Sequence, residues 1–307
     1  MGGASAQVLP VPVTILSMSG KKHRLSSGAA ATLACQWEAT APKVGNVHPR
    51  AAFADLKYDD FLRSAAVIGP IMERAEEWGV GRVVFEAVRA TRDAVGTNTN
   101  LGTVLLLAPL AAVPSQVSLA EGIGDVLERL TPDDTRLVYD AIRLSAAGGM
   151  GRVEEADVFS DAPPTLSLIA AMRLAADRDL VARQYTNNFA DVLTGVSAWI
   201  ADGVGRAWPL TEAIVHAHLR QMAADPDSLI QRKCGPEIAK QSQQRAAAVL
   251  ASGIPGEAAY QRAVDDFDIW LRADGHRRNP GTSADMIAAG LFVLFREGRL
   301  ELRTLKD

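Results

Sequence analysis

The chain has 307 residues, of which 22% are charged and 48% are hydrophobic, and its formal net charge is -4. A chain of this length buries about 75% of the surface of its unfolded state and needs no disulfide or metal to hold a core. The weakly acidic balance excludes a protein that coats nucleic acid, because such proteins neutralise phosphates with a large basic surface. The two cysteines, Cys35 and Cys234, form no CxxC pair. They exclude a disulfide framework and a zinc finger, and they favour a reducing cytoplasm.

No segment of the sequence has the pattern of a membrane span or a signal peptide. The most apolar run, residues 101–113, is interrupted by Pro109 and is shorter than the roughly 20 residues that a bilayer requires. Residues 8–16 are apolar, but no basic residue precedes them and two prolines break the run. We therefore expect a cytoplasmic protein in which residues 1–26 form a short extended segment.

Beyond residue 26 the apolar pattern is helical. Phe61, Ala65, Ile68 and Met72 follow a helical period and would form one buried stripe. Ser118 and Glu121 have the spacing of a capping box, and prolines at 132 and 236 stand where a first helical turn tolerates them. Further helices are predicted over residues 237–252, 265–274 and 283–297.

These patterns predict an all-α fold, with residues 27–307 forming a single compact multi-helix domain. Residues 147–164 are rich in turn formers and acids, and a segment of that kind is either a functional loop or a domain boundary. The helices predicted on each side are alike, which favours an internal loop.

The common catalytic signatures are absent. The sequence has no P-loop, no GxGxxG after a strand, no HExxH and no GxSxG. His216 and His218 are two residues apart on a predicted helix and point to different faces, which argues against a shared metal.

A first polar cluster begins at Glu38, near the end of a predicted helix. Pro42 and Gly45 end that helix and place Lys43 in a sharp turn. Asp55 and Asp59 follow four residues apart, so they would share one face if the next helix has already begun. Two carboxylates on one face repel unless a cation lies between them, and Mg²⁺ prefers such oxygen ligands together with substrate phosphates. The alternative is an acidic helix start that is stabilised by the helix dipole.

Two more polar clusters follow. In the loop of residues 96–102, two glycines bracket short polar side chains that could face a nucleotide; the alternative is a helix cap supplied by Thr99 or Asn100. Residues 225–236 place Arg232 and Lys233 before a Gly-Pro break, where they could bind phosphate. Solvated charges at a helix end are the alternative there.

In this order, the clusters resemble the motifs of the triphosphoribosyl-dephospho-CoA synthase family, which makes the prosthetic-group precursor of citrate lyase and malonate decarboxylase. Glu38, residues 42–45, Asp55 and residues 61–64 are similar to its Glu, PKPG, Asp and Phe-x-x-Ser elements. Residues 96–102 are similar to its GVNTHKG loop, residues 227–235 to its D-T-N-x-x-x-R-x-G stretch, and residues 281–288 to its G-x-x-A-D-L-L-A helix. The resemblance spans residues 30–297.

The sequence departs from the typical synthases at three places. The spacing from Gly45 to Asp55 is shorter than theirs. Val44 replaces the second proline of PKPG, and Asn100 and Leu101 replace the His-Lys pair of the loop. In these motifs the sequence resembles a divergent branch of the family, which is found in archaea and in bacteria with methanopterin-type one-carbon metabolism.

The resemblance implies a transferase that moves the triphosphoribosyl group of ATP to a ribose hydroxyl of dephospho-CoA or a related acceptor, with release of adenine. Glu38 and Asp55 are the candidate catalytic carboxylates, and Asp55 with Asp59 would hold Mg²⁺. A different phosphoribosyl-type transferase of methanopterin- or furan-type cofactor synthesis and a non-catalytic nucleotide-binding protein are the alternatives. The candidate nucleotide- and phosphate-binding residues are Lys43, Gly45, Asn98, Thr99, Asn100, Gly102, Arg232 and Lys233.

Overall fold

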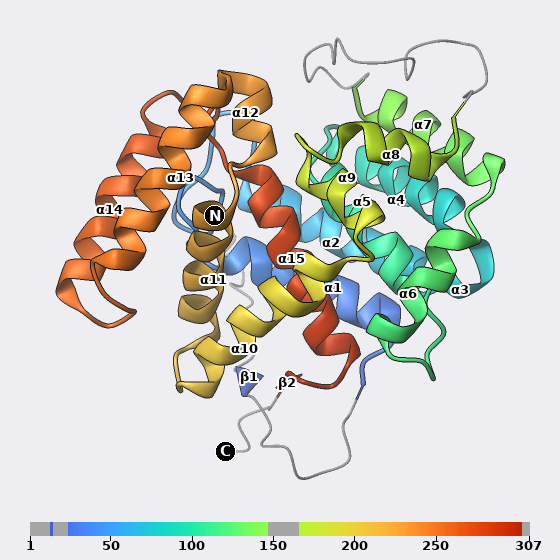
Figure 1. Ribbon diagram of the computed structural model, residues 1–307, viewed down its shortest axis with the longest axis horizontal. Coiled ribbons are helices and arrows are strands. Elements are labelled where there is room, and N and C mark those ends of the chain that lie inside the picture. The colour runs from blue at the N-terminus through green and yellow to red at the C-terminus, as the bar shows by residue number, and fades with distance from the viewer. Residues whose placement is uncertain (1–12, 15–23, 147–165, 303–307) are drawn as a thin grey trace, which may run out of the picture.

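The computed structural model describes residues 13–14, 24–146 and 166–302, and these residues are largely helical (Figure 1). The predicted all-α class is confirmed. The described residues also include two short strands, β1 (Val13–Thr14) and β2 (Glu301–Leu302). The strands form an antiparallel pair in which Val13 is opposite Leu302. Within the described part of the chain, no helix has the length and apolar character that crossing a membrane requires.

The helices follow one another along the whole described part of the chain. In chain order they are α1 (Ser27–Thr40), α2 (Tyr58–Met72), α3 (Ala75–Trp78), α4 (Val80–Val95), α5 (Leu101–Ala111), α6 (Leu119–Glu128), α7 (Pro132–Ala146), α8 (Leu168–Ala175), α9 (Leu180–Thr186), the π-helix η2 (Asp191–Val196), α10 (Ser197–Gly205), α11 (Leu210–Ala224), α12 (Ser228–Cys234), α13 (Pro236–Ala251), α14 (Ala258–Arg272) and α15 (Gly281–Arg296).

Local sequence signals set several of these boundaries. The Ser118 side chain caps α6 by accepting a hydrogen bond from the Glu121 backbone N–H, and Pro132 and Pro236 open α7 and α13. Ala65, Ile68 and Met72 of the predicted stripe on α2 are fully buried. The predicted helix over residues 265–274 begins earlier, at Ala258.

α15 is the central helix of the fold (Figure 1). All residues from Met286 to Arg296 are buried, and α1, α5, α10, η2 and α11 pack around the helix. A helix that is apolar on all sides can only be stable inside a protein. α15 therefore brings segments that are distant in the sequence to one place.

The apolar run of residues 101–113 contains the buried helix α5. Pro109 lies inside α5. It has no N–H to bond the carbonyl of Leu105, four residues earlier. The hydroxyl of Tyr185 donates to that carbonyl instead, at 2.7 Å. A partner from α9 thus satisfies the carbonyl that the proline leaves free.

Part of the predicted organisation lies outside the described residues. The loop of residues 147–164 is among them, as is the extended segment of residues 8–16 apart from β1. α1 begins at Ser27 with Ser26 as its N-cap. The division into residues 1–26 and 27–307 stays a prediction.

Candidate active site

The turn after α1 folds the Lys43 side chain back onto Glu38. The Lys43 Nζ atom lies 2.8 Å from Glu38 Oε1 and also donates to the Glu38 backbone carbonyl. Lys43 is fully buried, whereas the Glu38 side chain keeps 13% of its surface exposed. Gly45 allows this turn, because its φ of 71° is left-handed and a Cβ there would overlap Leu271 and Pro280. The result is a buried cation that compensates a carboxylate still within reach of solvent.

The start of α5 meets the start of α15 through Asp285. The Thr103 hydroxyl donates to Asp285 Oδ1 at 2.5 Å. The other oxygen, Oδ2, lies against Gly102, where any Cβ would overlap it. Glycine at position 102 is therefore needed for this close approach, which is a more specific role than the general nucleotide contact that we expected.

The rest of the 96–102 loop is bonded within the protein. The Asn98 side chain accepts from the backbone N–H groups of Asn100 and Leu101, at 3.2 and 3.0 Å. Asn100 occupies the N-cap position of α5, as the alternative interpretation expected, but its side chain makes no capping hydrogen bond and Asn98 bonds the first N–H of the helix instead. Thr99 bonds Ser64, and the buried Asn100 donates to Thr91. That these three residues bind nucleotide stays a prediction.

Asp227 ties α12 to α15. Its Oδ1 accepts from the backbone N–H groups of Leu229 and Ile230, at 2.9 and 3.0 Å, which caps α12. Its Oδ2 accepts from the backbone N–H and the hydroxyl of Ser283, at 2.7 and 2.8 Å. Burial raises the pKa of Asp227, and these hydrogen bonds oppose that rise. The 227–235 motif and the 281–288 motif are thus held together by one carboxylate.

The four motif segments meet at Asp285. Burial, together with the negative charges of Glu38, Asp227 and Asp179, raises the pKa of Asp285 to about 8 against the opposing effect of the Thr103 hydrogen bond. Asp179 is the N-cap of α9 and accepts from Val181 and Ala182. Glu38, Asp179 and Asp227 therefore act electrostatically on Asp285. Hydrogen bonds link the starts of α5 and α15, of α9 and α12, and of α12 and α15. Helix N-termini favour anions such as phosphate.

A second group of predicted residues, distant from one another in the sequence, interacts around Asp55 and Lys233. Asp55 Oδ1 lies 3.2 Å from His276 Nδ1. Burial and the neighbouring Arg232 lower the pKa of Lys233, while the charge of Asp55 opposes the change. Asp55 and Lys233, from the first and third clusters, therefore interact, and Arg232 is exposed beside them. A single pocket for Glu38, Lys43, Asp55, Asn98 and Arg232 stays a prediction.

The expected helical face shared by Asp55 and Asp59 does not exist. α2 begins at Tyr58, so Asp55 precedes the helix, and Asp59 is exposed. In the described residues, no group of three or more His, Cys, Asp or Glu side chains is placed to hold a metal ion. Mg²⁺ requires six ligands in near-octahedral geometry. These carboxylates therefore do not fit a closed Mg²⁺ site, and the ion would enter as the counter-ion of a triphosphate.

We accordingly expect Mg²⁺ to bind the protein weakly in the absence of nucleotide and more tightly with ATP, because ATP supplies phosphate oxygens as ligands. Isothermal titration calorimetry with and without ATP measures this directly. Tight Mg²⁺ binding to the protein alone would contradict the expectation.

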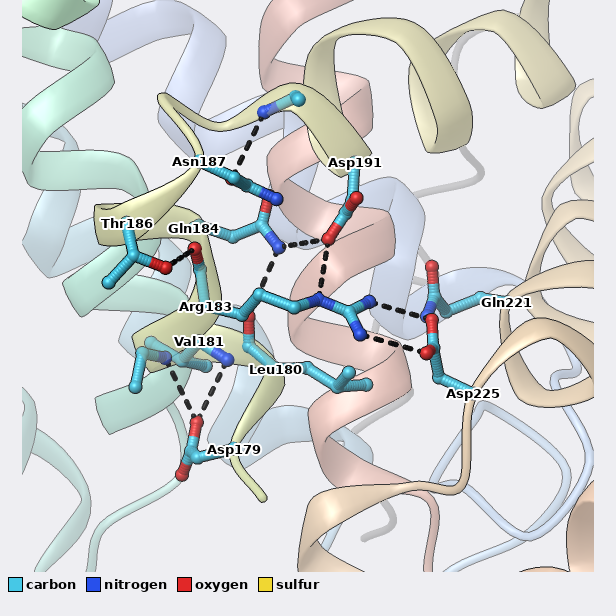
Figure 2. A network of polar contacts seen from close by, with 12 residues as sticks. Asp179, Leu180, Val181, Arg183, Gln184, Thr186, Asn187, Asp191, Gln221 and Asp225 are labelled. Atoms are coloured by element: carbon cyan, nitrogen blue, oxygen red, sulfur yellow. Dashed lines mark hydrogen bonds and ion pairs between the residues drawn. The ribbon is translucent and has the colours of Figure 1, made fainter. Parts of the chain in front are cut away.

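A network around Arg183 locks α9 to the turn between α11 and α12 (Figure 2). The Arg183 guanidinium makes two parallel hydrogen bonds to Asp225, at 2.8 and 2.7 Å, and Nε donates to Asp191 at 2.8 Å. Gln184, which is buried, donates to the same Asp191 oxygen. The hydrogen bonds to Asp225 raise the pKa of Arg183 further. Because Asp179 and Asp227 lie on the two segments that the network joins, it positions them relative to each other.

The backbone beside this network is unusual. Asn188 and Phe189 have left-handed φ values of 54° and 58°, and Phe189 is fully buried. The π-helix η2 follows, beginning at Asp191. A bulky residue at positive φ and a π-helical turn are both costly and concentrate at functional sites. Here they place Asp191 against Arg183.

A cavity of about 630 Å³ lies beyond the turn after α1, between that turn, α11 and α14. Pro42 and Val44, on each side of Lys43 in the sequence, line it together with residues such as Val215 and Tyr260. None of the predicted site residues lines this cavity.

Comparison with known proteins agrees with the resemblance. A family model described as ATP:dephospho-CoA triphosphoribosyl transferase matches residues 25–304. A crystal structure from Archaeoglobus fulgidus, of a protein described as a candidate triphosphoribosyl-dephospho-CoA synthase, has a similar fold, with a TM-score of 0.60 and 23% sequence identity. The match covers 77% of this chain and 99% of that chain. A comparison with curated proteins gives no match. Because the family model covers most of the sequence, the chain belongs to the ATP:dephospho-CoA triphosphoribosyl transferase family.

Proposed function

We propose that this transferase moves the triphosphoribosyl group of ATP to a hydroxyl of dephospho-CoA or a related acceptor, and that the reaction takes place beside Glu38 and Asp285. The observation that carries the proposal is the meeting of four distant motif segments at the start of α15. Glu38, Gly102, Asp227 and Asp285 lie far apart in the sequence, yet hydrogen bonds and electrostatic interactions join their surroundings.

The reaction places specific demands on such a site. The bond between C1′ of the ribose and adenine breaks, and positive charge develops at C1′, as it does in glycoside chemistry. A nearby carboxylate stabilises that charge, and it can also accept the proton of the attacking hydroxyl. Glu38 fits this role, because its side chain keeps some exposed surface. When no substrate is bound, the Lys43 ammonium compensates the charge of Glu38.

Phosphate groups need positive charge or helix N-termini. Backbone N–H groups at the starts of α12 and α15 already bond Asp227. Arg232 and Lys233, at the other end of α12, supply positive charge. Lys43 was expected to bind phosphate, but in the structure its ammonium faces Glu38. We propose that Lys43 acts on the transfer through Glu38, and that Arg232 and Lys233 bind phosphates that extend beyond the cluster. Mg²⁺ would enter with the triphosphate and partly neutralise it.

The acceptor is the less specific part of the proposal. Where the typical motif has His-Lys, this chain has Asn100, which is buried against Thr91, and Leu101, which packs on the core. Neither side chain offers a cation to an acceptor. This observation favours the alternative in which the acceptor is a hydroxyl of a different cofactor precursor.

The test is release of free adenine from ATP. The purified protein is incubated with ATP, Mg²⁺ and one acceptor at a time, and adenine is measured by chromatography, with ATP alone as the control. Acceptor-dependent adenine and a product whose mass equals acceptor plus the triphosphoribosyl group are expected. If no acceptor, dephospho-CoA and methanopterin or furan precursors included, yields adenine, the proposed activity is wrong and a nucleotide-binding role replaces it.

A further inference from the structure

We propose that Asp285 is the general acid of the transfer and donates the proton of its carboxyl group to adenine as the base leaves C1′. This inference rests on the proposed function and assigns a second carboxylate to the same site. Asp285 is the one ionisable side chain between Gly281 and Phe295 of the central helix.

The geometry holds Asp285 in one orientation. The Thr103 hydroxyl donates to Oδ1 at 2.5 Å, so a proton on the carboxyl group resides on Oδ2. Gly102 lets Oδ2 lie at the start of α5, where a Cβ would displace it. Asp285 is only partly covered, in contrast to the buried residues that follow it on α15. The carboxyl group is therefore fixed by its neighbours, and the residue is not fully buried.

The surroundings raise the pKa of Asp285 and place a cation beside Glu38. Burial and the negative charges of Glu38 from α1, Asp179 from α9 and Asp227 from α12 raise the pKa of Asp285 to about 8. Glu38 has the opposite environment, because the Lys43 ammonium lies 2.8 Å from it. In a glycosidic reaction a carboxyl group with a raised pKa is the typical general acid, and a second carboxylate is the typical base.

The step balances without a further reactant. The C1′–N9 bond breaks and its electron pair stays on adenine, while the Asp285 proton adds to N7, so that adenine leaves neutral. The acceptor oxygen forms the new bond to C1′, and its proton passes to Glu38. Asp285 is left as a carboxylate and Glu38 as an acid, and solvent exchange restores both.

The decisive experiment compares two leaving groups. A purine methylated at N7 is positively charged in ATP and leaves as a neutral base without a proton. Asp285→Asn should lose about 10²–10⁴-fold in adenine release from ATP and recover most of that loss with N7-methyl-ATP. Glu38→Gln should stay slow with both substrates, because Glu38 acts at C1′ and not on the base.

Equal losses by Asp285→Asn with both substrates would overturn the inference and leave the proposed function standing. If the wild-type protein releases no base from either substrate, the proposed function fails and the inference fails with it. The two failures are therefore distinguishable.

A second readout needs no activity. The pKa of Asp285 is about 8 in the folded protein and has its ordinary value of 3.8 in the unfolded chain. Its contribution to the stability of the fold is therefore fully present below pH 3.8 and is lost as the pH rises towards 8, because the unfolded chain ionises first. Asp285→Asn removes this loss. Its melting temperature should therefore rise relative to the wild type between pH 5 and pH 8. A constant difference over that range would show that Asp285 is ionised at neutral pH, which would overturn the inference.

Discussion

Glu38→Gln should lower the rate of adenine release by about 10²–10⁴-fold, while the affinity for ATP changes little. The amide has nearly the same shape as the carboxylate, but it carries no negative charge towards C1′ and accepts no proton. Steady-state kinetics and equilibrium binding of ATP measure the two effects separately. A matched control is Glu128→Gln, because Glu128 is exposed on α6; it should keep wild-type activity.

The Glu38 variant also leaves the Lys43 ammonium buried without its carboxylate partner. Its melting temperature must therefore be recorded, and Glu38→Asp serves as a second variant that keeps the charge. We expect Glu38→Asp to retain part of the activity. Wild-type turnover by a folded Glu38→Gln protein would show that Glu38 takes no part in the reaction.

Lys43→Met should reduce the free energy of unfolding by about 3–5 kcal/mol, because it leaves the carboxylate of a largely buried ion pair without its cation. It should also reduce turnover, since Glu38 is then no longer held in place. Urea unfolding measures the first effect. Lys240→Met is the matched control, because Lys240 is exposed on α13 and should change stability little.

A double variant separates stability from catalysis. Glu38→Gln with Lys43→Met removes both charges, so it should be more stable than Lys43→Met alone, although it stays inactive. Additive losses of stability in the double variant would mean that the two side chains do not interact, contrary to the 2.8 Å contact.

Much of the fold follows from local sequence signals. The buried stripe on α2, the Ser118 cap and the prolines at 132 and 236 act over a few residues, so they could be interpreted without knowledge of the rest of the chain. Pro109 could not, because its effect depends on Tyr185, which supplies the missing hydrogen bond from another helix. The separation of Asp55 from Asp59 depends on where α2 begins, and helix boundaries are the least certain part of any sequence pattern.

In the candidate site, too, some residues can be predicted from local sequence and others cannot. Glu38 and Lys43 could be selected because they stand at a helix end and a sharp turn. Asp285 was overlooked as a site residue, although a single carboxylate in an otherwise apolar helix is a usable signal. Arg183, Asp191 and Asp225 give no such signal, because their spacing in the sequence fits no helical face or motif. Only the tertiary fold brings them together (Figure 2).

The most direct test of the site is a crystal structure of the wild-type protein with a carbocyclic analogue of ATP, in which a methylene group replaces the ribose ring oxygen. The analogue cannot develop the positive charge at C1′ and so remains intact. We expect its C1′ to lie between Glu38 and Asp285, with adenine on the Asp285 side and the triphosphate towards Arg232 and Lys233. An analogue bound in the cavity between α11 and α14, away from both carboxylates, would contradict this assignment.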